Sequence, residues 1–182
     1  MIRGVIIEGL STAGKTSVFS AIKRLHSQTH NAEKTIIAIS EHFKQVLHSY
    51  HGILRSMEKD EHVQLLNRHV DYIEQQYNWI DSLGHMNPTN GVFYLLERFH
   101  VNHRAAFVNS AAIEMMEERL LRLNAHCVLL TLSKDVVESR FIESRSEAWK
   151  SYVMKNHSTV KEACLKFLED QEKLRSNRLF LL

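Results

Sequence analysis

The chain has 182 residues, of which 24% are charged and 44% hydrophobic, with a formal net charge of +2 at pH 7. These values are typical of one globular domain (residues 1–182), and they argue against a nucleic-acid-binding surface and a membrane-spanning segment. An apolar run begins at residue 2, which predicts no signal peptide. Cys127 and Cys164 are far apart in the sequence, so we expect buried thiols in a reducing cytoplasm rather than a disulfide or a zinc site.

The beginning of the chain has the pattern of a strand, a glycine loop and a helix. The apolar run of residues 2–8 predicts a buried parallel strand, and apolar residues at helical spacing predict a helix over residues 16–27. Residues 9–16 read Gly-Leu-Ser-Thr-Ala-Gly-Lys-Thr, a complete G-x-x-x-x-G-K-[ST] pattern. Such a loop aims backbone N–H groups and the positive end of a helix dipole at an anion. We therefore predict a phosphate-binding loop rather than an ordinary glycine turn.

The loop chemistry assigns expected roles to individual residues. Lys15 would reach the β- and γ-phosphates of ATP, and the Thr16 hydroxyl would be a Mg²⁺ ligand. ATP and Mg²⁺ are thus the expected cofactors. The residues expected to bind the nucleotide are Gly9, Ser11, Thr12, Ala13, Gly14, Lys15, Thr16 and Ser17.

The middle of the chain continues the alternation of strands and helices. Residues 35–39 are β-branched and apolar and predict a second buried strand, and a long helix is expected within residues 43–83. Apolar residues in that helix recur three and four positions apart: Val63, Leu66, Val70, Ile73, Tyr77 and Ile80. Such a stripe can pack against another helix of the fold or against a second copy, and its regularity predicts a homodimer.

The second half of the chain repeats the pattern after a turn-rich break. We expect strands over residues 92–96, 125–132 and 178–182, and helices over 103–123, 134–140 and most of 146–175. Strands that alternate with helices imply parallel pairing. The predicted fold class is therefore α/β, with a central parallel sheet of about five strands covered by helices on both faces. Trp149 is interpreted as a packing residue.

Charged residues follow several of the predicted strands. Glu41 follows the second strand, Glu97 and Arg98 end the third, and Lys134 comes soon after the fourth. Ligands bind beyond the carboxyl ends of the strands in such sheets, so these side chains are expected to converge on one cleft. The alternative for each is the first solvated residue of a loop.

Three segments resemble the thymidylate kinase and deoxynucleoside kinase superfamily. Residues 6–16 resemble its opening, in which Ile-Glu-Gly precedes the loop, and residues 95–99 resemble its acidic-Arg signature. Residues 130–133, followed by Arg140 and Arg145, resemble its fourth strand and arginine-bearing lid. The resemblance implies a three-layer P-loop NTPase fold, with an acceptor-binding region at about residues 43–90 and a lid at about 138–150.

The resemblance also implies residue roles. Glu97 would help to hold Mg²⁺, Arg98 would orient the acceptor, and Arg140 and Arg145 would close over the transferring phosphoryl group. The spacing of the lid arginines is looser than usual, which leaves open which of them is primary. The sequence stops where the family continues into an adenine-contacting loop, so the base would be held differently or by a shorter segment.

The acceptor determines the role of Glu41. A hydroxyl acceptor benefits from a carboxylate that takes its proton, whereas an ionised phosphate acceptor needs cations. No arginine is adjacent to Glu41, which favours a hydroxyl. The predicted activity is therefore an ATP-dependent nucleoside or nucleotide kinase, deoxynucleoside-kinase-like first and thymidylate-kinase-like next. The alternatives are a P-loop kinase for another small molecule and a regulatory P-loop NTPase.

Overall fold

The fold contains a sheet of four parallel strands at its centre. The computed structural model describes residues 1–30, 35–41, 46–51, 53–84, 91–107 and 111–176. The strands lie in the order β2-β5-β1-β6, and their bounds are Ile2–Glu8 (β1), Thr35–Ile39 (β2), Val92–Glu97 (β5) and Ala125–Leu129 (β6). The α/β class and parallel pairing are confirmed. The expected fifth strand, at residues 178–182, lies outside the described part of the chain.

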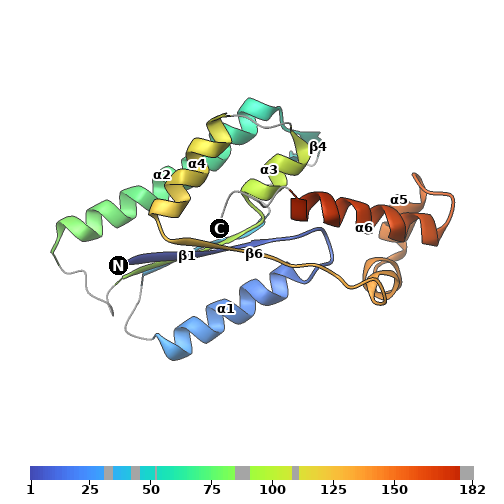
Figure 1. Cartoon of the computed structure of the whole chain (residues 1–182), viewed down its shortest axis with the longest axis horizontal. Helices are drawn as coiled ribbons and strands as arrows, with labels where there is room; N and C mark the ends of the chain where they lie inside the picture. Colours follow the sequence, from blue (N-terminus) through green and yellow to red (C-terminus); the bar gives the residue numbers. More distant parts are fainter. Residues whose placement is uncertain (31–34, 42–45, 52, 85–90, 108–110, 177–182) are drawn as a thin grey trace.

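Helices cover both faces of this sheet. Helix α1 (Lys15–Thr29) lies on one face, and α2 (Lys59–Ser82) and α4 (Ala111–Arg122) lie on the other, as Figure 1 shows. The alternation of side chains along β5 divides the core between these layers. Tyr94 and Leu96 pack in the cluster beneath α2 and α4, whereas Phe93 and Leu95 pack in the cluster beneath α1. Burial of both faces explains why β5 reads as a continuous apolar run.

The apolar stripe of α2 is used inside the chain. Val63, Leu66, Val70 and Ile73 are buried, and Tyr77 and Ile80 are partly buried against the same core cluster. The prediction that this stripe pairs with its copy in a homodimer is therefore wrong. Heptad-like spacing identifies a helix face that must be covered, and here the sheet and α4 cover it. A homodimer stays a prediction, without an assigned surface.

Other elements differ from the sequence-based expectation. A two-stranded antiparallel hairpin, β3 (Leu47–Tyr50) and β4 (Ile53–Ser56), precedes α2 within the region expected to be helical. The helix expected over residues 103–123 is two helices, α3 (His100–Ala106) and α4. The buried ion pair of Arg104 and Glu117, with Nη2 and Oε2 2.6 Å apart, joins them. The backbone of Phe107 is extended, with φ −131° and ψ 147°, and this ends α3.

The last elements form a lobe with its own small core. A π-helix, η2 (Ser139–Glu143), replaces the helix expected over residues 134–140, and α5 (Glu147–Met154) and α6 (Val160–Ser176) follow. Ile142, Val153 and Ala163 are buried together between these elements. The lobe lies at the right-hand end of the molecule in Figure 1, near the loop that joins β1 to α1.

A side-chain amide ties this lobe to the end of the fourth strand. Gln171 of α6 donates to the Leu132 carbonyl at 2.9 Å and accepts from the Leu132 N–H at 2.7 Å. Strand β6 stops at Leu129, opposite Glu8, the last residue of its partner β1, and Leu132 is instead bonded to the Gln171 side chain. The fourth strand is also an edge strand, in which Val128 is exposed rather than buried.

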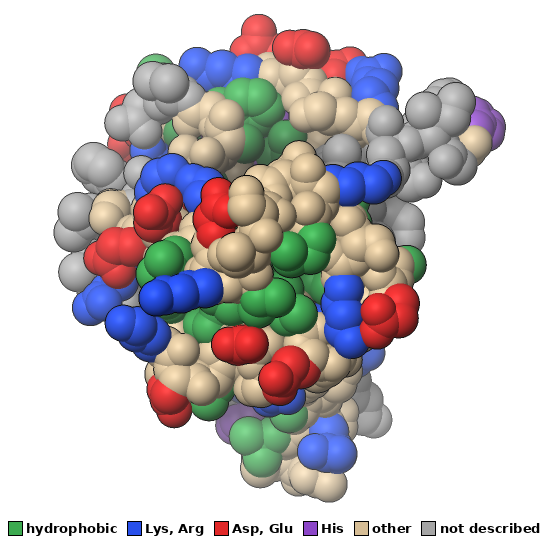
Figure 2. Space-filling view, turned by 90° about the vertical axis from the view of Figure 1, so that its right-hand side faces the viewer, with side chains coloured by type: hydrophobic (Ala, Val, Ile, Leu, Met, Phe, Trp, Pro, Cys, Tyr) green, Lys and Arg blue, Asp and Glu red, His purple; other side chains and the backbone are tan. Residues whose placement is uncertain are grey.

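The surface of the lobe end carries charges of both signs. Figure 2 shows basic and acidic side chains interspersed around a central group of hydrophobic side chains on this face.

Within the residues that the structure describes, no helix combines the length and apolar character needed to cross a bilayer. Both cysteines are free thiols and are half-buried, so the expectation of fully buried thiols was too strong.

Candidate active site

The loop between β1 and α1 has the backbone geometry that its glycines allow. Gly9 has φ 143° and Gly14 has φ 88°, both in the region that favours glycine. A Cβ atom at Gly9 would lie 2.7 Å from the Leu130 carbonyl oxygen, so a side chain would push the loop away from the segment after β6. Gly14 is also the N-cap of α1, and no side chain makes a capping hydrogen bond there. The first N–H groups of α1 therefore remain available to an anion.

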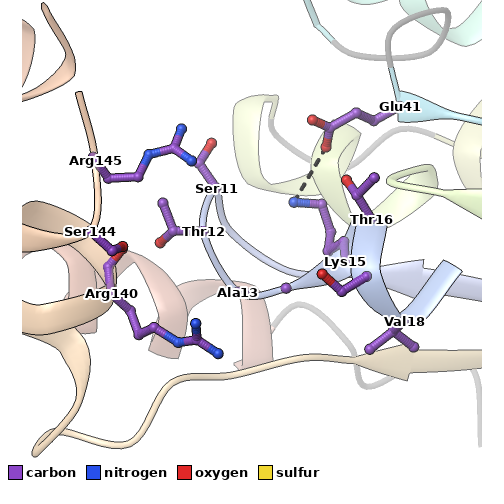
Figure 3. Close-up of a pocket in the computed structure, with 12 residues that line it drawn as sticks. Ser11, Thr12, Ala13, Lys15, Thr16, Val18, Glu41, Arg140, Ser144 and Arg145 are labelled. Carbon is purple, nitrogen blue, oxygen red and sulfur yellow. Dashed lines mark hydrogen bonds and ion pairs between the residues drawn. The ribbon is translucent and has the colours of Figure 1, made fainter. Parts of the chain in front are cut away.

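A cavity of about 530 Å³ lies against this loop, between the strand ends and the lobe. Figure 3 shows the loop on one side and the lobe arginines on the other, with Glu41 reaching in from the end of β2. The lining residues are Ser11, Thr12, Ala13, Gly14, Lys15, Thr16, Ser17, Val18, Glu41, Arg140, Ser144 and Arg145. The fold thus brings together loop, Glu41 and lid residues that the sequence analysis singled out separately.

Glu41 lies between two cations at the inner end of the cavity. Its Oε2 atom is 3.3 Å from Lys15 Nζ and 3.6 Å from Arg98 Nε. Lys15 also donates to the Leu10 carbonyl at 3.0 Å, and Arg98 Nη2 donates to the Ser11 hydroxyl at 3.4 Å. Arg98 therefore spans the space between the loop and Glu41.

The charge state of Lys15 reflects this environment. Its side chain is only 4% exposed. Burial lowers the pKa of Lys15 from its ordinary value, and the nearby Arg98 cation adds to this, while Glu41 and Glu97 act in the opposite direction. A buried lysine whose ammonium contacts the Glu41 carboxylate is well placed to move that contact to a stronger anion, such as a phosphate.

Thr16 and Glu97 form the part of the site that fits a magnesium ion. The Thr16 hydroxyl donates to Glu97 Oε1 at 2.7 Å, across a separation of 81 positions in the chain. A hydroxyl and a carboxylate in contact are hard oxygen donors, and Mg²⁺ is usually held by one or two such groups together with substrate phosphates. The described residues contain no group of three His, Cys, Asp or Glu side chains able to hold a metal ion. The donor set therefore fits Mg²⁺ shared with a nucleotide.

Glu8 has a positioning role that the sequence analysis did not assign. Its carboxylate is buried, and Oε1 accepts N–H groups from Phe99 at 2.8 Å and Val101 at 3.1 Å. Burial raises the pKa of Glu8 to about 7, although these hydrogen bonds act to lower it. Arg98, directly before them, has φ 56°, unusual for a residue other than glycine. Glu8 thus holds the corner that carries Arg98. In the sequence, the signal for this role of Glu8 was its charge at the end of an apolar run.

The lid arginines come from the lobe. Arg140 lies in η2, and Arg145 follows η2 by two residues; both are exposed and line the cavity wall opposite Lys15 (Figure 3). Ser144, between them, also lines the cavity and was missed by the sequence analysis. Lys134, also expected at this edge, is not among the lining residues.

The charged residues that line the cavity are Lys15 of the loop, Arg140 and Arg145 of the lobe, and Glu41 after β2. Neither the comparison with protein-family models nor the comparison with curated proteins gives a match to this chain. The cations can neutralise a polyphosphate, and the carboxylate beside Lys15 can accept a proton.

Proposed function

We propose that this protein has a P-loop NTPase fold and is a kinase that transfers the γ-phosphoryl group of ATP to a small acceptor, with a nucleoside as the favoured acceptor. The observation that carries the proposal is the position of Glu41. Its carboxylate lies 3.3 Å from the loop lysine, in the same cavity as the phosphate-binding loop and both lid arginines. A phosphoryl group bound by Lys15 would therefore be next to a candidate proton acceptor.

Different residues of the site have different roles in the proposed phosphoryl transfer. This reaction has a loose transition state, so catalysis consists mainly of positioning and charge stabilisation. The loop N–H groups and Lys15 hold the β- and γ-phosphates, and Arg140 and Arg145 stabilise charge from the opposite wall. Mg²⁺, when bound at Thr16 and Glu97, supplies further charge neutralisation on the phosphate oxygens.

The acceptor end of the site supports a hydroxyl group. Arg98 orients the acceptor through its guanidinium, and Glu41 accepts the proton of the attacking hydroxyl. Once Lys15 moves its contact to phosphate, the Glu41 carboxylate loses one cationic neighbour and becomes a better base. A nucleoside monophosphate acceptor is the second candidate, because Arg98 could equally hold a phosphate.

The test is ATP consumption with a panel of nucleosides, nucleoside monophosphates and other alcohols. We expect consumption that depends on an acceptor, and we expect Lys15→Ala to abolish it while the melting temperature stays near that of the wild type. Lys161→Ala, an exposed lysine of α6, is the matched control and should behave as the wild type. Wild-type turnover in Lys15→Ala would refute the proposal. Consumption that no acceptor changes would indicate a regulatory NTPase instead.

A further inference from the structure

Trp149 makes two directed contacts besides packing in the lobe core. It lies in the first turn of α5, where its backbone N–H donates to the Ser146 hydroxyl at 3.4 Å. Its ring is partly buried against the lobe core and meets the Phe141 ring edge-on, with centroids 5.8 Å apart. The indole therefore packs against Phe141 and the core of the lobe.

The first directed contact is with Arg145. The guanidinium carbon of Arg145 lies 5.0 Å from the centre of the Trp149 ring, within the range of a cation–π interaction. An arginine that rests on an aromatic face keeps its in-plane N–H donors free. Arg145 also lines the cavity opposite the phosphate loop, and in Figure 3 its side chain extends toward Ser11. The ring thus limits the freedom of Arg145 without occupying the donors that an anion would use.

The second directed contact is with the π-helix that contains Arg140. The indole Nε1–H of Trp149 donates to the Phe141 carbonyl at 2.8 Å. The π-helical turn is closed by a bond from the Ser144 N–H to the Ser139 carbonyl at 2.9 Å. Such turns are rare and are frequently found at functional sites. Trp149 is therefore bonded to the turn from which Arg140 extends into the cavity.

We propose that Trp149 is a positioning residue that presents Arg145 and Arg140 to the triphosphate of a bound nucleotide. This inference rests on the proposed function, because it assumes that the cavity binds a nucleoside triphosphate. The Trp149 ring holds one face of the Arg145 guanidinium, and the indole N–H holds the backbone turn that carries Arg140. Loss of both contacts leaves the two arginines with more conformations, so binding must order them.

The first measurement is the affinity for MgATP and for inorganic tripolyphosphate. A cation–π contact of this kind corresponds to roughly a 3- to 30-fold change in affinity. We expect Trp149→Leu to weaken binding of both ligands by about that factor, and Trp149→Phe to have a smaller effect because it keeps an aromatic face. Trp79→Leu, at an exposed tryptophan of α2, is the matched control and should leave both affinities unchanged.

The second measurement separates positioning from general support of the lobe. We expect Arg145→Gln and Trp149→Leu to be non-additive in a double-mutant cycle, because Trp149 acts in part through the guanidinium that Arg145→Gln removes. The chain has two tryptophans, so Trp79→Phe leaves Trp149 as its only indole. In that variant, MgATP should change the indole fluorescence in a saturable manner, and Arg145→Gln should reduce the change.

The possible outcomes separate the two proposals. If the wild type binds MgATP and Lys15→Ala does not, but Trp149→Phe and Trp149→Leu bind as the wild type, the positioning role is refuted and the proposed function remains. Additive effects in the cycle, or fluorescence insensitive to MgATP, would also refute it. If the wild type binds neither ligand, the proposed function fails and this inference with it. If Trp149→Leu does not fold, Trp149→Phe and the fluorescence measurement decide.

Discussion

The substitution Glu41→Gln tests the chemistry of the proposed site most directly. Glutamine keeps the size and polarity of the side chain but removes both its charge and its capacity to take a proton. Glu41 Oε2 lies 3.3 Å from Lys15 Nζ and 3.6 Å from Arg98 Nε, and the side chain is 22% exposed. The substitution therefore removes the carboxylate that both cations contact, without opening a cavity in the core.

The expected magnitude follows from the role assigned to the carboxylate. General-base catalysis typically contributes about 10²- to 10⁴-fold, equivalent to about 2.7 to 5.4 kcal/mol in the activation barrier. For a hydroxyl acceptor, kcat should fall by this factor. ATP affinity should be retained or tightened, because Lys15 no longer has a competing carboxylate. For a phosphate acceptor, removal of a negative charge should leave kcat unchanged or improve acceptor binding.

The assay is steady-state ATP consumption with the best acceptor, with kcat and the two KM values determined separately. Arg98→Ala, measured in parallel, should be damaging with either acceptor type because it removes the guanidinium that orients the acceptor. Glu172→Gln changes an exposed carboxylate of α6 and is the matched control. Losses in Glu41→Gln and Arg98→Ala together support a hydroxyl acceptor, and loss in Arg98→Ala alone supports a phosphate acceptor. Full activity in both would place the acceptor elsewhere and refute the reasoning.

Two further predictions concern the fold. Leu66→Ala should lower the free energy of unfolding by about 2 to 5 kcal/mol, whereas Leu165→Ala, at an exposed position, should change it little. If urea titrations give similar free energies of unfolding for the two variants, the buried position of the stripe is contradicted. Burial lowers the pKa of His100 to about 3 in the folded protein. As the pH falls below 6.5, His100 therefore gains a proton in the unfolded chain but not in the folded one. The free energy of unfolding should decrease by about 1.4 kcal/mol per pH unit because of this group. Glu8, with a pKa raised to about 7, binds a proton in the folded protein before it does so in the unfolded chain, so between pH 7 and 4.5 it increases the free energy of unfolding as the pH falls. His100→Gln should therefore remove the histidine part of the slope in urea titrations between pH 4.5 and 6.5, and an unchanged slope would show that His100 is not neutral in the folded protein.

The sequence by itself determined the elements whose signals are local. The candidate phosphate loop is recognisable because its glycines and the following Lys15 and Thr16 are contiguous. The central strand β5 is recognisable because a parallel strand buried on both faces is apolar along its length. The charged residues after the strands were also predictable, since parallel strands bring their carboxyl ends to one edge. Of these residues, Glu41 lines the cavity, Arg98 and Glu97 contact the lining residues Glu41 and Thr16, and Lys134 is not among the lining residues.

The tertiary structure decided which residues meet when they are distant in the chain. The stripe of α2 specifies a covered helix face, but only the fold shows that the sheet and α4 cover it. Likewise, the break between α3 and α4 accompanies the Arg104–Glu117 pair, and local helical periodicity cannot register that contact.

The tertiary structure likewise decided the contacts that position the site residues. Glu8 bonds to N–H groups more than 90 positions away, and Trp149 is bonded to a π-helix that has no established sequence pattern. Hydrogen bonds and cation–π contacts depend on angles and distances between side chains, and spacing along the sequence specifies neither. Several residues that line the candidate site were therefore predictable from the sequence, whereas the contacts that hold the site in place became apparent only when the chain was folded.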